Sequence, residues 1–246
     1  HSKKFTIIAK NKEKRKIDFP IDTIDWIEKF IKEFKTIIFN NWKSASKINF
    51  IRHFKTPLND GRYLGQSSNP EIDLNNIRKN KMQNADIVYS SPLLRCIQSA
   101  NIIHKNTNVI QDNRLLEFDY GDADGLQYKD FANLYPNIIS DWEYDKDPHF
   151  PNGENTNDVL KRLLSFMHDL SKNLDKKSNT SISIFTHNGI LRCLIGNYLK
   201  IEKKDWYKIF IPHGIVIEFL YHNGMFFPNI SRQLLSKILK NIGKKN

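Results

Sequence analysis

The sequence has few cysteines and no long apolar run. Cys96 and Cys193 are the two cysteines among the 246 residues, and both lie within apolar patterns that predict helices. We expect small buried side chains there rather than a disulfide or a catalytic thiol. No apolar stretch approaches the ~20 residues that a membrane-spanning helix needs, and no signal-peptide pattern stands at the start. The sequence therefore predicts no membrane partner, and the expected compartment is the cytoplasm.

The chain has an excess of positive charge, but the common nucleic-acid-binding motifs are missing. The formal net charge is +11, which favours anionic partners in a general way. Nucleic-acid binders usually gather their basic residues on a recognisable motif, so we do not expect nucleic acid as the partner. Internal repeats are also missing, and the length suits one α/β domain with a small appendage.

Residues 1–47 differ from the rest of the chain. Phe5–Ala9 has the composition of a strand, and a helical spacing of apolar side chains follows it at Ile24, Ile27, Ile31, Phe34 and Ile38. We interpret residues 1–47 as an N-terminal extension docked on a main domain of residues 48–246. The alternative is a dimerisation helix, which would make the protein a homodimer.

From Lys47 onward, expected strands and helices alternate. β-branched and aromatic runs predict strands at residues 47–53, 85–89, 181–186 and 215–220, and helical spacing predicts helices at residues 92–103, 156–174, 190–195 and 234–239. Pro92 suits the first position of its helix. This alternation predicts an α/β protein, a three-layer α/β/α sandwich with a mostly parallel central sheet.

Two of the expected strands deliver a histidine where they end. Lys47–His53 and Ser181–His187 are built alike, and His53 follows directly on Arg52. Arg95 lies one turn into the helix after a third strand, and its planar guanidinium suits a phosphate group. Ligands of open α/β sheets gather at the carboxyl ends of the strands. The pattern predicts an anion site without a metal ion, because the two arginines would repel a cation.

Five segments together resemble the histidine phosphatase superfamily, the phosphoglycerate mutase-like proteins. Arg52–Asn59 resembles the opening Arg-His-Gly motif, Ser90–Ala100 the second arginine motif, Leu115–Gly125 the acidic motif, Pro151–Asn155 a loop of the phosphatase members, and Thr186–Gly189 the second histidine motif. The segments occur in the family's order, and the resemblance covers about residues 48 to 221. It implies a phosphoglycerate mutase-like fold with no cofactor.

The resemblance also implies roles for individual residues. His53 would be the nucleophile that receives the phosphoryl group. The phosphoryl oxygens would be surrounded by Arg52, Asn59, Arg95 and His187. Glu117 would protonate the leaving oxygen and later activate the hydrolytic water. These roles agree with the chemistry, because phosphoryl transfer depends on positioning and on fixed positive charge around the equatorial oxygens.

Two residues depart from the family pattern. Phe54 replaces the glycine after the nucleophile, and Asn188 replaces a common glycine after the second histidine. Glycine at such positions usually permits close backbone approach or unusual dihedral angles. We expect Phe54 to narrow the pocket, to alter specificity or to impair turnover. Asn188 and Arg62 are further candidates for binding substrate, and Asp119 is the reserve candidate for the proton donor.

We therefore predict a metal-independent phosphatase. Its substrate would be a phosphomonoester of a small metabolite such as a sugar phosphate, hydrolysed through a phosphohistidine on His53. One alternative is a phosphoglycerate-type mutase, which would return the phosphoryl group to a second hydroxyl. The other is a regulatory module that binds phosphate but has impaired catalysis, an alternative that Phe54 and the N-terminal extension motivate.

Overall fold

The computed structural model describes residues 3–8, 14–19, 45–77, 84–175, 179–222 and 224–242. Near the N-terminus, β1 (Lys3–Ile8) and β2 (Lys14–Phe19) form an antiparallel pair. β1 includes Phe5–Ile8 of the strand expected at Phe5–Ala9, whose last residue lies outside the described residues. The helix expected over residues 24–38 lies outside the described residues, and so does the alternative of a dimerisation helix.

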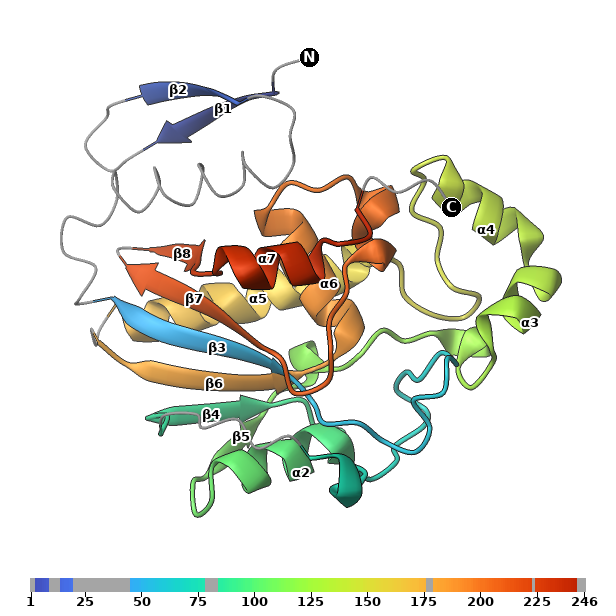
Figure 1. The fold of residues 1–246 in the computed structure, drawn as a ribbon, viewed down its shortest axis with the longest axis horizontal. Helices are drawn as coiled ribbons and strands as arrows, with labels where there is room; N and C mark the ends of the chain where they lie inside the picture. Colours follow the sequence, from blue (N-terminus) through green and yellow to red (C-terminus); the bar gives the residue numbers. More distant parts are fainter. Residues whose placement is uncertain are drawn as a thin grey trace.

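The main domain is built on one six-stranded sheet (Figure 1). Its strands run in the order β5 (Val109–Gln111), β4 (Ile87–Ser90), β6 (Ser181–Thr186), β3 (Ser46–Arg52), β7 (Val216–His222) and β8 (Met225–Pro228). The first four are mutually parallel, whereas β7 pairs antiparallel with both of its neighbours. The prediction of a mostly parallel sheet is confirmed.

Helices and short 3₁₀ turns complete the domain (Figure 1). The helices are α2 (Leu94–Ile103), α3 (Tyr128–Leu134), α4 (Pro136–Glu143), α5 (Thr156–Leu174), α6 (Asn188–Tyr198) and α7 (Arg232–Ile238). The 3₁₀ turns are η2 (Leu74–Asn76), η3 (Asn113–Leu115), η4 (Gly121–Ala123) and η5 (Lys203–Lys208). In the described part of the chain, no helix combines the length and the apolar character needed to cross a membrane.

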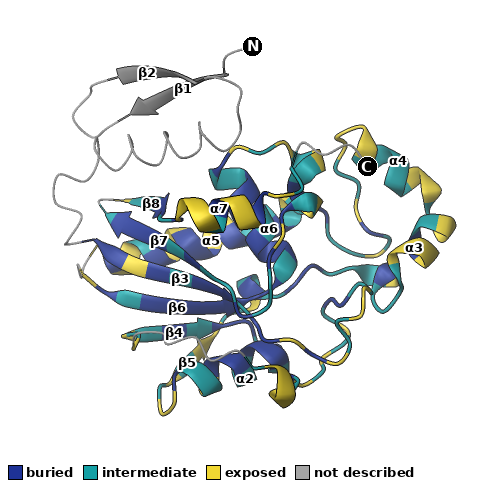
Figure 2. Ribbon diagram, viewed as in Figure 1, coloured by how far each residue is buried: buried dark blue, intermediate teal, exposed yellow. Residues whose placement is uncertain are grey.

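The central strands are buried on both faces because helices cover both. Successive side chains of a strand point to opposite faces. Ile48 and Phe50 of β3 therefore join the larger core with α5 and α6, whereas Ile51 joins a smaller core with Cys96 and Ala100 of α2. Figure 2 shows the resulting dark central strands beside the more exposed α3 and α4. This arrangement of two cores is the expected three-layer sandwich.

The helix predicted over residues 156–174 is confirmed as α5. Asn155 caps it by accepting a hydrogen bond from the Asp158 backbone N–H, while the Asp158 side chain accepts one from the Asn155 N–H, which together form a capping box. Its apolar stripe faces the core, although Leu164 is 43 % exposed and lies outside it. The amphipathic pattern of the sequence thus predicted the length of this helix and most of its buried face correctly.

The helix predicted from Pro92 begins later than expected. Its first helical residue is Leu94, because Leu93 has an extended backbone with φ −70° and ψ 136°. The Leu94 N–H is capped by the side-chain oxygen of Asn69, at 2.7 Å, from a loop 25 residues earlier. Ser91 contributes a longer hydrogen bond, 3.3 Å from the Leu93 N–H. The predicted start of this helix was therefore wrong, because the residue that caps its first turn comes from a distant segment.

Candidate active site

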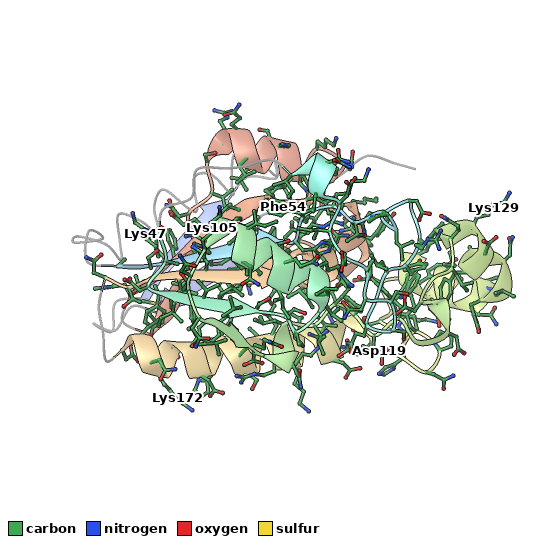
Figure 3. The ribbon with its side chains drawn as sticks, turned by 90° about the horizontal axis from the view of Figure 1, so that it is seen from below. Lys47, Phe54, Lys105, Asp119, Lys129 and Lys172 are labelled. Atoms are coloured by element: carbon green, nitrogen blue, oxygen red, sulfur yellow. The ribbon has the colours of Figure 1, made fainter. Side chains whose placement is uncertain are left out.

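The two histidines lie side by side at the carboxyl end of the sheet. β3 and β6 are parallel and Arg52 is in register with Thr186, so each strand delivers its histidine to the same edge. The ring centroids of His53 and His187 are 5.2 Å apart, and both side chains are buried. In Figure 3, Lys47 at the start of β3 lies at one end of the sheet and Asp119 lies toward the other. The expected meeting of the two strand ends is therefore observed.

His53 is held as a neutral imidazole. Its Nδ1 lies 2.6 Å from the Phe54 carbonyl oxygen and donates to it, which leaves the lone pair on Nε2. Burial lowers the pKa of His53 well below its usual value, and the charges of Arg52 and Arg95 lower it further. A neutral ring with a free Nε2 is the form of histidine that can act as a nucleophile.

His187 is oriented by two neighbours. Arg95 donates from Nε to Nδ1 of His187 over 3.3 Å, so Nε2 carries the proton and donates to the Ser91 hydroxyl over 2.8 Å. Burial lowers the pKa of His187, followed by the charge of Arg95 and the neighbouring His53. His187 is thus a second neutral imidazole whose tautomer is fixed by hydrogen bonds.

Arg95 is fully buried and also binds the loop of residues 64–68. Its Nη1 donates to the Ser68 carbonyl over 2.9 Å, and its Nη2 donates to the carbonyls of Gly65, at 2.8 Å, and Leu64, at 3.4 Å. The loop is fixed from its other side by Asp124, whose carboxylate accepts from the Gly65 and Ser67 N–H groups. Arg95 therefore connects this loop directly to His187.

Arg52 adds a second cation beside His53. Its Nη1 donates to the carbonyl oxygen of Ile211, whereas its Nε is buried without a hydrogen-bond partner. Burial lowers the pKa of Arg52 to about 10, so the guanidinium remains charged at neutral pH. A partly buried cation whose Nε has no partner is suited to bind an anion.

Glu117 is buried at the N-terminal end of α6. Its Oε1 accepts from the backbone N–H groups of Phe118 and Gly189, each at 3.0 Å. Its main-chain carbonyl accepts from Arg162, at 2.9 Å, and from Gln66, at 2.8 Å. Both the backbone and the side chain of this carboxylic acid are therefore held in place, as a proton-transfer group requires.

Three weaker candidates have other contacts. Asn59 accepts from the Thr56 N–H and hydroxyl through its Oδ1, and Arg62 pairs with Asp60 over 2.6 Å on a part-exposed surface. Asn188 begins α6, and its Oδ1 is buried with no partner. Their predicted roles toward substrate remain predictions.

The acidic loop uses its aspartates to shape the backbone. Asp119 accepts from the Gly121 N–H at 3.0 Å and Asp122 accepts from the Asn152 side chain at 3.1 Å, while Asp124 holds Gly65 and Ser67. These contacts fit the capping role that short acidic side chains often have in turns. Glu117 is the carboxylic acid of this loop that lies against α6.

Phe54 has room where the resembled motif has glycine. Its backbone does not have a positive φ, its N–H donates to the Ser99 hydroxyl over 2.9 Å, and its ring is buried. The ring packs against Gly214, where an added Cβ would lie 3.1 Å from a ring carbon. The missing side chain of Gly214 therefore leaves room for the Phe54 ring, which a glycine at position 54 would not need.

The sequence reasoning missed a third histidine. The ring of His213 lies 5.4 Å from that of His53, and its Nε2 is buried without a hydrogen-bond partner. His213 stands in a Pro-His-Gly segment just before β7. Because β7 is antiparallel to β3, its start lies at the edge where β3 ends. The sequence signal for this residue was a proline–glycine turn just before an expected strand. That this strand runs antiparallel to β3 is known from the structure.

Arg192 was also missed. Its Nε donates to the Ile209 carbonyl over 2.9 Å, two residues before the carbonyl that binds Arg52. Burial lowers the pKa of Arg192, and the largest opposing influence is the electrostatic effect of Tyr120. Two arginines thus hold the segment that leads into His213.

The described residues contain no group of three or more histidine, cysteine, aspartate or glutamate side chains arranged to hold a metal ion. Cys96 and Cys193 are free and buried, and burial raises the pKa of both thiols. The expectation of small buried cysteine side chains is confirmed.

Comparison with known proteins identifies matches over most of the chain. A family model, the histidine phosphatase superfamily (branch 1), matches residues 48–228. Phosphoserine phosphatase 1 of Hydrogenobacter thermophilus is 26 % identical over 174 residues, which cover 65 % of this chain and 80 % of that protein. A fructose-2,6-bisphosphatase of Saccharomyces cerevisiae is 28 % identical over 125 residues, covering 50 % of this chain and 26 % of that protein.

Solved structures share the fold. Bacillus stearothermophilus YhfR superposes with a TM-score of 0.64 at 20 % identity, covering 76 % of this chain and 99 % of the other. A mutant phosphoserine phosphatase from Entamoeba histolytica, in complex with phosphoserine, superposes with a TM-score of 0.63 at 23 % identity, covering 77 % and 99 %. A phosphoglycerate mutase from Bacillus anthracis superposes with a TM-score of 0.63 at 15 % identity, covering 82 % of this chain and 99 % of that one.

Proposed function

Because the chain belongs to the histidine phosphatase superfamily, we propose that it is a metal-independent phosphatase that hydrolyses a phosphomonoester of a small metabolite through a phosphohistidine on His53. The observation that supports this most is the state of His53, a buried neutral imidazole whose Nδ1 is bound to the Phe54 carbonyl. Its Nε2 is therefore the atom available for attack.

In the first step, Nε2 of His53 attacks the phosphorus atom and the bond from phosphorus to the leaving oxygen breaks. Glu117 transfers its proton to that oxygen, so that an alcohol rather than an alkoxide departs. Arg52, Arg95 and His187 would stabilise the charge on the equatorial oxygens. Asn59 and Asn188 complete the proposed set of phosphoryl ligands, with Arg62 reaching a more distant part of the substrate.

In the second step, water attacks the phosphohistidine. Glu117, now a carboxylate, accepts a proton from the water while the bond between phosphorus and Nε2 breaks. Orthophosphate leaves, His53 regains its lone pair and Glu117 is again protonated. The proton that was lost to the leaving group is thereby replaced, and the cycle closes without a cofactor.

A small phosphorylated metabolite is the proposed substrate class. The similar proteins include phosphoserine phosphatases and fructose-2,6-bisphosphatases, whose names state small phosphorylated substrates. A panel of sugar phosphates, phosphoserine, fructose 2,6-bisphosphate and 3-phosphoglycerate would identify the preferred member by phosphate release.

The decisive test uses 4-nitrophenyl phosphate with the wild type, His53→Ala and the control His149→Ala, since the His149 side chain is 60 % exposed. We expect His53→Ala to lose about 10⁴-fold or more in kcat, while the control and the chelator-treated wild type keep their rates. Acid-labile phosphate on His53, trapped by rapid quenching and located by mass spectrometry, is the expected intermediate. Persistent activity in His53→Ala, or isomerisation of primed 3-phosphoglycerate faster than phosphate release, would contradict the proposal.

A further inference from the structure

His213 lies in a tight turn that is bonded to the nucleophile strand. The Ile215 N–H donates to the Pro212 carbonyl over 3.3 Å, and Gly214 has a φ of +70°, which suits glycine at the third position of such a turn. The Gly214 N–H donates to the carbonyl of Arg52 over 3.0 Å. The turn is thus attached to the residue directly before His53.

Two side chains fix the same turn from other directions. The guanidinium of Arg52 donates to the carbonyl of Ile211, and the buried ring of Phe54 packs against Gly214. The residues on both sides of His53 in sequence therefore hold the segment that carries His213. The backbone that carries His213 is therefore positioned relative to the nucleophile by several independent contacts.

The imidazole of His213 lies beside that of His53 and has an unused polar atom. The two ring centroids are 5.4 Å apart, close to the 5.2 Å that separates His53 from His187. Among the described residues, three buried side-chain atoms have no hydrogen-bond partner: Arg52 Nε, Asn188 Oδ1 and His213 Nε2. Arg52 and Asn188 directly adjoin His53 and His187 in sequence, and the Arg52 Nε and His213 Nε2 are the two of these atoms that can donate to an anion.

His213 is neutral at physiological pH. Burial lowers its pKa to about 3, with smaller contributions from the charges of Arg52 and Lys55. A neutral imidazole carries one N–H, and an anionic oxygen is a strong acceptor for it. A buried donor without a partner is costly for a protein, and a bound anion removes that cost.

We propose that His213 donates a hydrogen bond from Nε2 to a nonbridging oxygen of the phosphoryl group as it moves to and from His53. This role rests on the proposed phosphatase function. His213 would be an additional phosphoryl ligand, paired with Arg52 through the turn that both residues build. The group it binds is the phosphoryl group itself, so its contribution is the same for every leaving group.

The test measures anion binding, which does not require turnover. Orthophosphate and orthovanadate are titrated calorimetrically into the wild type, His213→Ala, His213→Asn and His213→Gln. A glutamine amide reaches about as far as Nε2 of histidine, whereas an asparagine amide reaches only about as far as Nδ1. His149→Gln is the matched control on the surface, and thermal unfolding of each variant reports its folding.

We expect the Ala and Asn variants to bind both anions about 10- to 100-fold more weakly, the range for one hydrogen bond to a charged group. The Gln variant should bind within about threefold of the wild type, because its N–H restores the bond. Equal binding by the Asn and Gln variants, whether weak or strong, would overturn the assignment. If the Ala variant fails to fold, the comparison of anion binding between the Asn and Gln variants still tests the proposal.

The two proposals fail separately. If the wild type forms no phosphohistidine and releases no phosphate from any phosphomonoester, the phosphatase proposal fails, yet the anion titrations still report on His213. If the wild type is an active phosphatase but its anion affinity and kcat/KM are unchanged in His213→Asn, the role of His213 alone is excluded.

Discussion

The ring of Phe54 packs against Gly214, and a Cβ added to that glycine would lie 3.1 Å from Cε1 and 3.2 Å from Cδ1 of the ring. One residue follows the nucleophile and the other follows His213. The large side chain in the first position is accommodated by the missing side chain in the second. Phe54 is therefore part of the packing that shapes the site, in a position where the family pattern has glycine.

This pair predicts a measurable coupling. Gly214→Ala should lower the free energy of unfolding by about 1–3 kcal/mol, because it adds both strain at a positive φ and a clash with the ring. Phe54→Ala should cost about 3–5 kcal/mol as a buried aromatic truncation. In the double variant the clash disappears, so the combined loss should be smaller than the sum. Urea unfolding of the four proteins gives the coupling, and strict additivity would contradict it.

Glu117→Gln should separate substrates by their leaving groups. The amide oxygen of glutamine keeps the hydrogen bonds from Phe118 and Gly189, but the amide has no proton to transfer. We expect the first step to slow by about 10² to 10⁴-fold for a sugar phosphate and far less for 4-nitrophenyl phosphate, whose leaving group needs no proton. Rapid-mixing kinetics measure this step. Equal losses for both substrates would remove Glu117 as the acid and make Asp119 the next residue to test.

Gly189→Ala should displace Glu117 without unfolding α6. An added Cβ would lie 2.4 Å from Cδ2 of Phe118 and 2.5 Å from Oε1 of Glu117, so both the ring and the carboxyl group must move. Alanine is otherwise favourable within a helix, so a loss of activity reports the displacement of Glu117 together with its neighbour Phe118. We expect kcat for an alkyl phosphate to fall by about tenfold or more, with the helical circular dichroism unchanged. A wild-type kcat would show that the position of Glu117 does not limit the reaction.

Arg162→Lys should loosen the segment that carries Glu117. The guanidinium binds both oxygens of Glu154 and also the carbonyls of Arg114, Leu116 and Glu117. A lysine ammonium lacks the planar fork that makes these bonds together. We expect a loss of about 2–3 kcal/mol in the free energy of unfolding and a reduced kcat. Arg62→Lys, in an exposed pair with Asp60, should change stability little.

Acid should destabilise the protein through its buried histidines. The pKa of His213 is lowered to about 3 from an ordinary value of 6.5, so the unfolded chain binds a proton more readily than the folded one between these values. The stabilisation from a neutral His213 is complete above pH 6.5 and is lost progressively as the pH falls toward 3. His213→Gln should therefore show a smaller drop in Tm between pH 7 and pH 4.5 than the wild type. His149→Gln is the comparison that should leave the drop unchanged.

Local sequence signals predicted the strands β3, β4, β6 and β7 and the helices α2, α5, α6 and α7, but not β5, β8, α3 or α4. The strands ending at His53 and His187 were found because their β-branched runs are buried on both faces, and α5 was found because its apolar spacing covers its whole length. The start of α2 was missed because its cap, Asn69, comes from a distant loop. No periodicity encodes a contact of that kind.

The position of a site residue could be predicted where a sequence motif lies at the end of an expected strand. Arg52, His53, Arg95 and His187 gather at one edge of the sheet because parallel strands end together, and Glu117 reaches them by binding the first turn of α6. His213 was missed because its position depends on the antiparallel pairing of β7. A single histidine in a turn has no repeat or spacing that marks it as a site residue. Its place beside His53 follows only from the pairing of β7 with β3.

Each nitrogen of the Arg95 guanidinium already has an acceptor, either His187 or a carbonyl of residues 64–68. The guanidinium has five N–H groups for these four acceptors, and Nη1 has one acceptor for its two N–H groups. A phosphoryl oxygen that binds Nε or Nη2 must therefore exchange with an existing acceptor, so substrate affinity there is the difference between two sets of hydrogen bonds. The loop of residues 64–68 is thus a competitor within the protein for the same donors. Substitutions at Asp124 that weaken the loop's hold would shift this competition and change affinity from a distance, without touching the substrate.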